Sequence, residues 1–121
     1  MNPIDIVEEQ LQAYNARDLE RFAATYAEGI RIYRLPETQP AIIGLAKLRE
    51  IYRARFSSPN LHAEIVNRIV LGNKVIDHER VAGIKDTPIE AVAVYEVADG
   101  LIQVVWFFYP EAPFPVPEVK R

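Results

Sequence analysis

The sequence predicts an α+β fold, with helices in the first half of the chain and mostly antiparallel strands in the second. Up to about residue 56, apolar side chains recur at the three-to-four-residue spacing of amphipathic helices. From residue 61 onward they alternate with polar side chains or form short continuous runs between turn signals, as in strands. The chain has 121 residues, of which 50% are apolar, so residues 1–121 are expected to form one domain around a single core.

Two helices are expected at the start of the chain. Asn2 followed by Pro3 is typical of an N-cap and a first helical turn, and the helical spacing continues to about Tyr14. Asp18 is a suitable N-cap for a second, shorter helix. We expect that helix to end before Gly29, because glycine favours helix termini.

A short strand and a third helix follow. Residues 30–33 are typical of a strand, and Pro36 and Pro40 indicate a loop after it. The third helix is predicted by apolar residues that share one helical face, namely Leu45, Leu48, Tyr52 and Phe56.

The second half of the chain is expected to contain longer strands joined mainly by tight turns. The pairs Gly72-Asn73 and Asp99-Gly100 are hairpin signals. Regular alternation in the first of these strands would place Arg68 on the same face as His62 and Glu64. The expected strands cover residues 61–71, 75–83, 89–98 and 101–109.

The last expected strand, residues 101–109, is apolar at both odd and even positions. Helices would cover one of its faces, so the other face needs an apolar covering as well. In a chain of this size, the second face can border a ligand cavity, form a dimer interface, or do both. Residues 110–121 contain four of the nine prolines and are expected to form an extended Pro-rich tail on the surface.

The composition excludes several classes of function. Without cysteine, the chain can form neither disulfides nor zinc-thiolate sites, and a reducing compartment, the cytoplasm, is expected. Neither a membrane span nor a signal peptide is expected, since apolar runs are short and the first residues lack a basic start. A net charge of −3 with scattered basic residues argues against nucleic-acid binding. The two histidines lack metal-ligand spacing, so no metal or other cofactor is expected.

Two segments carry a resemblance to a known family. The segments "AYNARDLERFAATYAEGIRIY" and "VIDHERVAG…IEAVAVYEVADGLIQVVWFFYP" resemble SnoaL-like and ketosteroid-isomerase-like proteins of the NTF2-like (cystatin-like) superfamily, over roughly residues 4–110. The resemblance implies a cone in which three helices pack on a strongly curved, mixed and mostly antiparallel sheet that encloses an apolar pocket. It also implies a homodimer formed through the outer face of the sheet.

The catalytic pattern of ketosteroid isomerases is not matched. Their general base aligns with Arg34, which cannot accept a proton at neutral pH. Their two hydrogen-bond donors fall at or near Gln10 and Ala93, and Tyr14 lies one helical turn beyond the first of them.

The Asp-Arg-Asp set of the limonene-epoxide-hydrolase branch is also incomplete. Residues 79–81 match its pattern, but Ala82 stands at one Asp position, and the other falls among Val and aromatic residues at 105–107. Only Arg80 corresponds to that set.

The stretch "VIDHERVAG" carries the strongest candidate site. In a strand, His78 and Arg80 share one face, and Asp77 and Glu79 share the other. The resemblance implies that the Arg80 face looks into the pocket. His78 would then be a general acid or base, and Arg80 would bind a carboxylate or an enolate. The alternative is that these charged side chains form structural ion pairs on an exposed face of the sheet.

Other residues complete this candidate site. Tyr14 is a possible hydroxyl donor in catalysis, and Arg34 could bind the substrate as a second cation. Aromatic side chains could line a cavity for a flat apolar ligand, although core packing explains them equally well. These aromatic candidates are Tyr33, Tyr95, Trp106 and Phe108.

Two hypotheses about function remain. In the first, the protein is an isomerase-, cyclase- or hydrolase-type enzyme that acts on a small apolar ketone- or carboxylate-bearing substrate by His-assisted proton transfer. In the second, it is a non-catalytic protein that binds a hydrophobic small molecule, or a dimerisation or interaction module. Both include a small apolar molecule or a second copy of the chain as partner.

Overall fold

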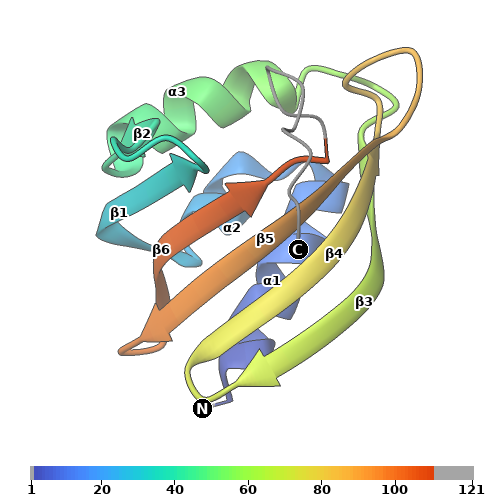
Figure 1. The fold of residues 1–121 in the computed structure, drawn as a ribbon. Helices are drawn as coiled ribbons and strands as arrows, with labels where there is room; N and C mark the ends of the chain where they lie inside the picture. The colour runs from blue at the N-terminus through green and yellow to red at the C-terminus, as the bar shows by residue number, and fades with distance from the viewer. Residues whose placement is uncertain (1, 111–121) are drawn as a thin grey trace, which may run out of the picture.

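In residues 2–110, the part of the chain that the computed structural model describes, one mixed six-stranded sheet carries three helices on one face (Figure 1). The helices are α1 (Pro3–Ala16), α2 (Leu19–Ala23) and α3 (Leu45–Arg55). The strands are β1 (Tyr26–Arg34), β2 (Ile42–Ile43), β3 (His62–Leu71), β4 (Lys74–Ala82), β5 (Ile89–Ala98) and β6 (Leu101–Phe108). The predicted α+β class is confirmed. Residues 111–121, which contain most of the predicted Pro-rich tail, lie outside the described residues.

The strands are arranged in the order β2-β1-β6-β5-β4-β3, and the sheet does not close into a barrel. All neighbouring strands are antiparallel except β1 and β6, which run parallel. The long strands β3, β4 and β5 bend around α1, as Figure 1 shows. The predicted curved, mixed and mostly antiparallel sheet is therefore present.

Both predicted N-caps are present. The Asn2 side chain accepts a hydrogen bond from the backbone N–H of Ile4 at 3.0 Å, and the Asp18 side chain accepts one from Arg21 at 3.1 Å. Between them, α1 ends at Ala16, and the left-handed backbone of the C-cap residue Arg17 (φ 53°) closes the helix. These caps fix the turn that brings α2 back against α1.

The second helix is shorter than predicted, and the first strand is longer. The helix ends at Ala23, and β1 already begins at Tyr26 rather than at residue 30. The reason is tertiary: Tyr26 pairs with Ile102 of β6, and its ring packs 5.0 Å from that of Phe22.

A β-bulge in β3 changes the face of the residues that follow it. The register with β4 shifts between Ile65 and Asn67, so Val66 is an extra residue in the strand. Arg68 therefore lies on the helix-covered face, opposite Asp77, and not on the face of Glu64 as regular alternation predicts. The bulge thus brings a cation to a buried carboxylate.

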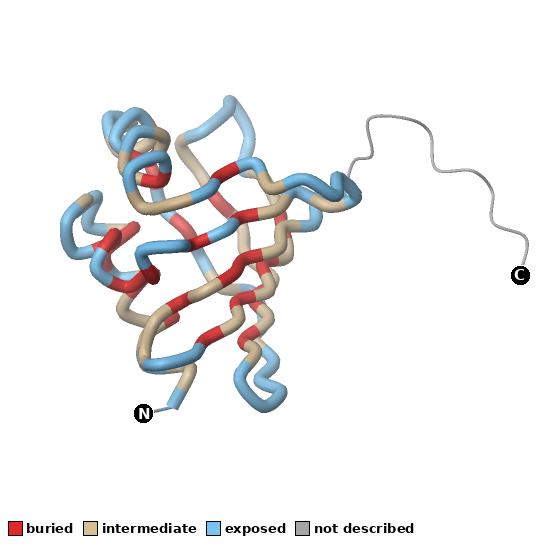
Figure 2. The backbone as a smooth tube through the Cα atoms, turned by 90° about the vertical axis from the view of Figure 1, so that its left-hand side faces the viewer, coloured by how far each residue is buried: buried red, intermediate tan, exposed pale blue. Residues whose placement is uncertain are grey.

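The core lies between the helices and the face of the sheet that they cover. Buried residues alternate with more exposed ones along the strands (Figure 2). The largest fully buried side chains are Phe22, Ile30, Ile32, Leu48, Leu61 and Ile102. Among the described helices, none is both long and apolar enough to cross a lipid bilayer.

Candidate functional site

A cavity of about 1200 Å³ lies between the covered face of the sheet, α1 and α3, and continues to the loop at residues 83–88. Apolar and aromatic side chains line part of its wall, and polar and charged side chains line the rest. That wall includes Leu11, Ile32, Ile51, Val81, Tyr95 and Phe107. The cavity can therefore take a small apolar molecule, because such ligands bind in concave, mostly apolar pockets.

The alternation of β4 decides which charged side chains reach this cavity. Val75 and Val81 are buried on the helix-covered face, and Asp77 and Glu79 share their side of the strand. The apolar side chains of this parity fill the core, so the two carboxylates between them also point inward. Asp77 is only 1% exposed.

His78 and Arg80 lie on the opposite, outer face of the sheet. Their side chains are 40% and 41% exposed. His78 Nε2 is 2.6 Å from Glu90, and Arg80 pairs with Glu90 and Glu64 at 3.6 and 3.4 Å. Arg80 is not among the residues that line the cavity, whereas His78 and its partner Glu90 are. The catalytic role expected of His78 stays a prediction.

Glu79 is the chemically most distinctive side chain of the cavity. Its pKa is raised to about 7, mainly because burial penalises the charged form; the negative charge of Asp77 adds to this shift, and Arg55 opposes it. Among residues 2–110, its carboxyl group has neither a hydrogen-bond nor an ion-pair partner. At neutral pH both protonation states are populated, which is what a general acid–base requires.

Asp77 has a different environment from Glu79. Arg68 donates two hydrogen bonds to its carboxylate, from Nε at 2.6 Å and from Nη2 at 2.9 Å. Arg68 Nη1 also donates to Glu8 of α1 at 2.9 Å. Asp77 is thus fixed in an ion-pair network that ties α1 to β3 and β4, while its charge still acts on Glu79.

Arg55 and Tyr14 lie at the helix side of the cavity. Arg55 Nη1 donates to Tyr14 Oη at 3.5 Å, and the guanidinium lies 5.4 Å from the centre of the Tyr52 ring. Burial raises the pKa of the Tyr14 hydroxyl, so it stays protonated and can donate a hydrogen bond. Tyr14 is a lining residue of the cavity, consistent with the predicted hydroxyl donor.

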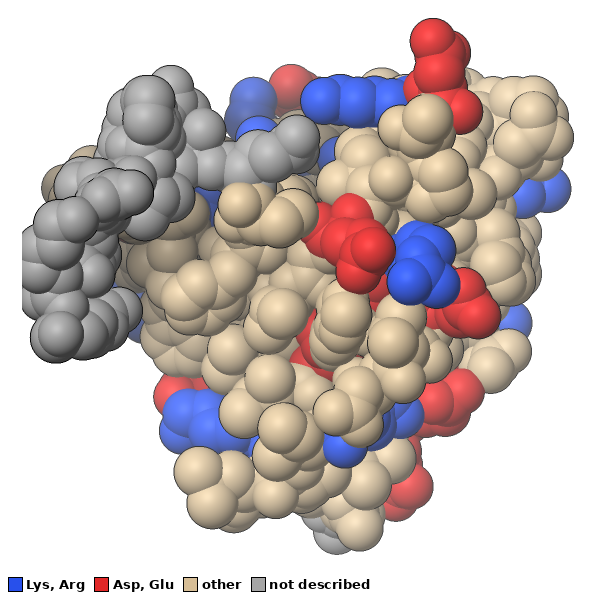
Figure 3. Space-filling view, turned by 45° about the vertical axis from the view of Figure 1, so that its right-hand side comes forward, with Lys and Arg blue, Asp and Glu red and all other residues tan. Residues whose placement is uncertain are grey.

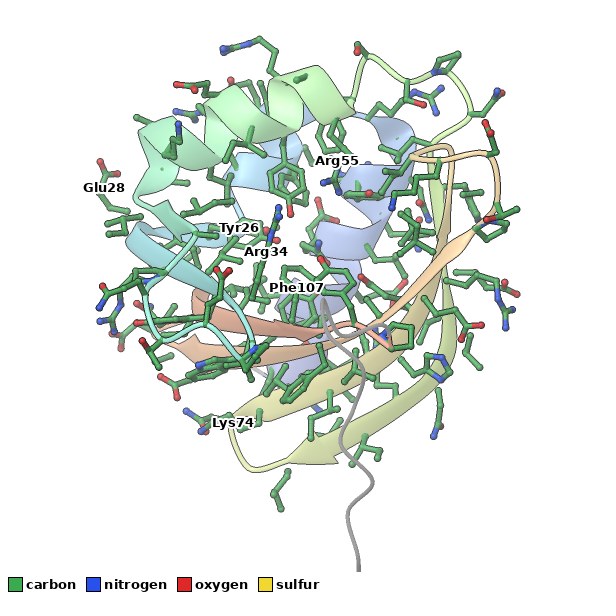
Figure 4. The ribbon with its side chains drawn as sticks, turned by 45° about the horizontal axis from the view of Figure 1, so that its top comes forward. Tyr26, Glu28, Arg34, Arg55, Lys74 and Phe107 are labelled. Carbon is green, nitrogen blue, oxygen red and sulfur yellow. The ribbon has the colours of Figure 1, made fainter. Side chains whose placement is uncertain are left out.

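Arg34 reaches the same space from the end of β1. It pairs in register with Phe107 of β6 and lines the cavity. In Figure 4 the side chains of Arg34 and Arg55 extend into the space between α3 and the sheet, above Phe107. Neither guanidinium forms an ion pair with a carboxylate of the described residues.

The predicted aromatic residues divide between the two faces of the sheet. Tyr95 is 2% exposed and lines the cavity. Its partner in β6 is Val105, so Trp106 and Phe108 lie on the outer face, together with Tyr33. The Tyr33 and Trp106 rings stack there at 6.2 Å. Tyr95 and Trp106 therefore lie on opposite faces of the sheet, because directly opposed residues share a face, while Phe108 still lines the same cavity as Tyr95.

Sequence reasoning missed Arg55 and placed Glu79 on the wrong face. A signal for Arg55 is present, because it lies seven residues after buried Leu48, on the same helical face. For β4 the signal is ambiguous, since Ile76 and Ala82 make the other parity apolar at its ends as well. The described residues contain no group of three or more His, Cys, Asp or Glu side chains placed to hold a metal ion.

A comparison with protein families settles the family of this chain. The model of the SnoaL-like domain matches residues 7–105, most of the sequence. The chain belongs to the SnoaL-like domain family. No curated protein matches this SnoaL-like chain.

Solved structures confirm the NTF2-like, cystatin-like fold of this SnoaL-like protein. An uncharacterised cystatin-fold protein from Novosphingobium aromaticivorans has a TM-score of 0.80 and 23% identity, covering 88% of this chain and 97% of its own. A proposed ketosteroid isomerase from Kribbella flavida has a TM-score of 0.76 and 27% identity, covering 98% and 88%. An epoxide hydrolase of the LEH-like type from M. tuberculosis has a TM-score of 0.73 and 19% identity, covering 88% and 81%.

Proposed function

We propose that this SnoaL-like protein is an isomerase-type enzyme that moves a proton next to the carbonyl group of a small apolar ketone, with Glu79 as the general acid–base. One observation supports this most strongly. Glu79 is a carboxyl group without a partner among the described residues, on the wall of an apolar cavity, and its pKa is raised to about 7. This replaces the histidine of the sequence-based hypothesis with the carboxyl group of the next residue, which lies on the opposite face of β4.

The chemistry is a balanced proton shift. The ionised Glu79 carboxylate takes a proton from the carbon next to the carbonyl, and the C–H electron pair forms a C=C bond. The carbonyl π electrons move to oxygen, which becomes an enolate. In a β,γ-unsaturated ketone the enolate is a dienolate, and Glu79 returns the proton to its γ carbon. The electron pair of the old C=C bond forms the new C–H bond and the carbonyl re-forms, so the product is the conjugated ketone and the electron count does not change.

Tyr14 is the group proposed to stabilise the enolate oxygen. Its oxygen accepts a hydrogen bond from Arg55, which leaves the hydroxyl hydrogen available for the substrate. The nearby guanidinium also makes the hydroxyl a stronger donor. An apolar, partly enclosed cavity strengthens both interactions, because the effective dielectric constant is lower than in water.

The test is hydrogen–deuterium exchange at the carbon next to the carbonyl, followed by proton NMR with cyclic ketones in heavy water. Glu79→Gln should slow enzyme-dependent exchange about 100-fold or more, as expected on loss of a general base. The matched control is Glu64→Gln, which changes an exposed carboxylate paired with Arg80. Retained exchange in Glu79→Gln would refute the proposal, and loss in His78→Ala would favour the histidine mechanism.

A second candidate function, binding of a hydrophobic small molecule without turnover, is favoured by the size and apolar wall of the cavity. In that case the protein would not speed up hydrogen–deuterium exchange in any ketone. Apolar ligands would still raise the unfolding temperature of the protein. For either function we propose the cytoplasm as the compartment, because a chain without cysteine is compatible with a reducing environment.

We also propose that the protein is a homodimer that associates through the outer face of the sheet. Leu35, Val94, Trp106 and Phe108 border a shallow apolar hollow of about 320 Å³ on that face. Aromatic side chains such as tryptophan and phenylalanine are enriched in protein interfaces. Towards β3 and β4, most of the surface in Figure 3 is neutral, and acidic and basic groups adjoin one another.

A further inference from the structure

Two arginine side chains of the cavity form no ion pair within the described residues, whereas most of the other described arginines do. Arg34 comes from the end of β1 and Arg55 from the end of α3, and both line the cavity. Arginines that form ion pairs are Arg21, Arg49, Arg68 and Arg80. Of the described arginines without an ion pair, only Arg34 and Arg55 reach the cavity.

Arg55 is only weakly compensated in its present surroundings. It is half-buried beside apolar and aromatic side chains, and its contacts are a 3.5 Å hydrogen bond to Tyr14 and the face of the Tyr52 ring. A guanidinium has five N–H donors, so about four remain for a ligand. A partly buried cation without a counter-ion is costly, and a ligand that brings a negative charge relieves that cost.

The charges of the cavity favour a ligand that carries negative charge. Asp77 is balanced by Arg68, which also holds Glu8. Arg34 and Arg55 bring two positive charges, and ionised Glu79 brings one negative charge. With Lys85, which also lines the cavity, the positive charges exceed the negative charge of Glu79, which favours an anionic ligand. The planar fork of a guanidinium also fits a carboxylate in a bidentate way.

We propose that Arg34 and Arg55 form a carboxylate-binding site, and that the substrate is a small keto acid with an apolar body. This inference rests on the proposed function for its carbonyl chemistry but not for the binding itself. Arg34 is exposed, so the carboxylate lies towards the cavity opening, and the apolar body packs against Phe107 and the inner wall. The carbonyl group then lies between Tyr14 and Glu79.

The experiment is calorimetric binding of a matched pair of probes, 4-oxocyclohexanecarboxylate and its methyl ester, to the full chain. The acid should bind wild type at least about tenfold more tightly than the ester, as expected for charge-assisted pairing. Arg55→Met and Arg34→Met should each reduce that preference to less than about threefold, and Arg55→Lys should retain part of it. The matched control is Arg53→Met, which removes an exposed arginine of the same helix that does not line the cavity.

The same measurement in Glu79→Gln separates this inference from the proposed function. Removing the negative charge of Glu79 should keep or increase the preference for the acid, whatever happens to hydrogen exchange. Equal binding of acid and ester, failure of wild type to bind the acid at millimolar concentration, or an unchanged preference in folded Arg55→Met and Arg34→Met would each overturn the carboxylate site. Circular dichroism shows which variants are folded. If Arg55→Met does not fold, Arg55→Lys takes its place in the test.

Discussion

Two carboxyl groups on the same face of one strand have different environments. Asp77 is held by two hydrogen bonds from Arg68, while Glu79, two residues further on, has no partner among the described residues. Environments that separate two neighbouring carboxyl groups in this way commonly separate their roles. Asp77 is suited to hold α1, β3 and β4 together, and Glu79 is suited to exchange protons with a ligand.

The raised pKa of Glu79 predicts a pH-dependent loss of stability. The folded-state pKa of about 7 exceeds the ordinary value of 4.5, so the folded protein binds more protons than the unfolded chain between these pH values. The free energy of unfolding therefore falls as pH rises from about 4.5 to 7. Glu79→Gln removes this cost, and at pH 8 the variant should be more stable than wild type by roughly 3 kcal/mol.

Urea unfolding of wild type and Glu79→Gln across this pH range measures the effect. The difference between the two proteins should grow with pH and level off above about 7. Glu64→Gln is the control, because that carboxylate is exposed on the outer face. A stability difference that does not change with pH would mean that Glu79 is not desolvated in the folded protein.

At the level of single elements, segments with strong local signals were predicted well. The caps at Asn2 and Asp18 fixed the starts of α1 and α2, and strand β5 has the predicted bounds. The facts that decided the site were not local. Whether β4 turns its odd or even residues inward depends on what packs against it, and the bulge at Val66 depends on pairing with β4. Periodicity therefore predicted the strands but not their faces.

The loop after β4 offers a prediction at this scale. Gly83 has a φ of 94°, and a Cβ there would lie 2.6 Å from the backbone of Asn60 and Leu61. Ser58 also donates a 2.6 Å hydrogen bond to the Gly83 carbonyl, so this contact joins two loops, of which residues 83–88 border the cavity. Gly83→Ala must move one backbone segment, and it should destabilise the protein by about 2 kcal/mol or more through strain and overpacking.

The matched variant is Gly100→Ala, because Gly100 also has a positive φ, 75°, but open space at the Cβ position. It should cost only the backbone strain, about 1 kcal/mol. Chemical unfolding of both variants isolates the contribution of the close contact. Equal losses in the two variants would show that the two loops adjust without cost.

At the scale of the whole molecule, the two apolar faces of β6 have different surroundings. One face, with Val105 and Phe107, covers the core and the cavity, and the other carries Trp106 and Phe108. The sequence left a cavity and a dimer interface as alternatives for a second apolar face. The structure has an apolar surface on each face: the cavity lies on the face that the helices cover, and the shallow hollow lies on the other face, which the helices leave uncovered (Figure 1). Family resemblance predicted this architecture, although it could not assign the side chains of β4.

The outer face provides the last prediction, which concerns the assembly. Trp106 stacks on Tyr33 at 6.2 Å and borders the shallow apolar hollow. If two copies associate there, Trp106→Glu places a charge in a desolvated interface and should convert the dimer to a monomer in sedimentation velocity at micromolar concentration. Val70→Glu is the control, because Val70 is 42% exposed on the edge strand β3 but pairs with Val75 on the helix-covered side of the sheet. Sedimentation of the wild-type protein as a monomer would refute the dimer, and the apolar outer face would then need a different partner to cover it.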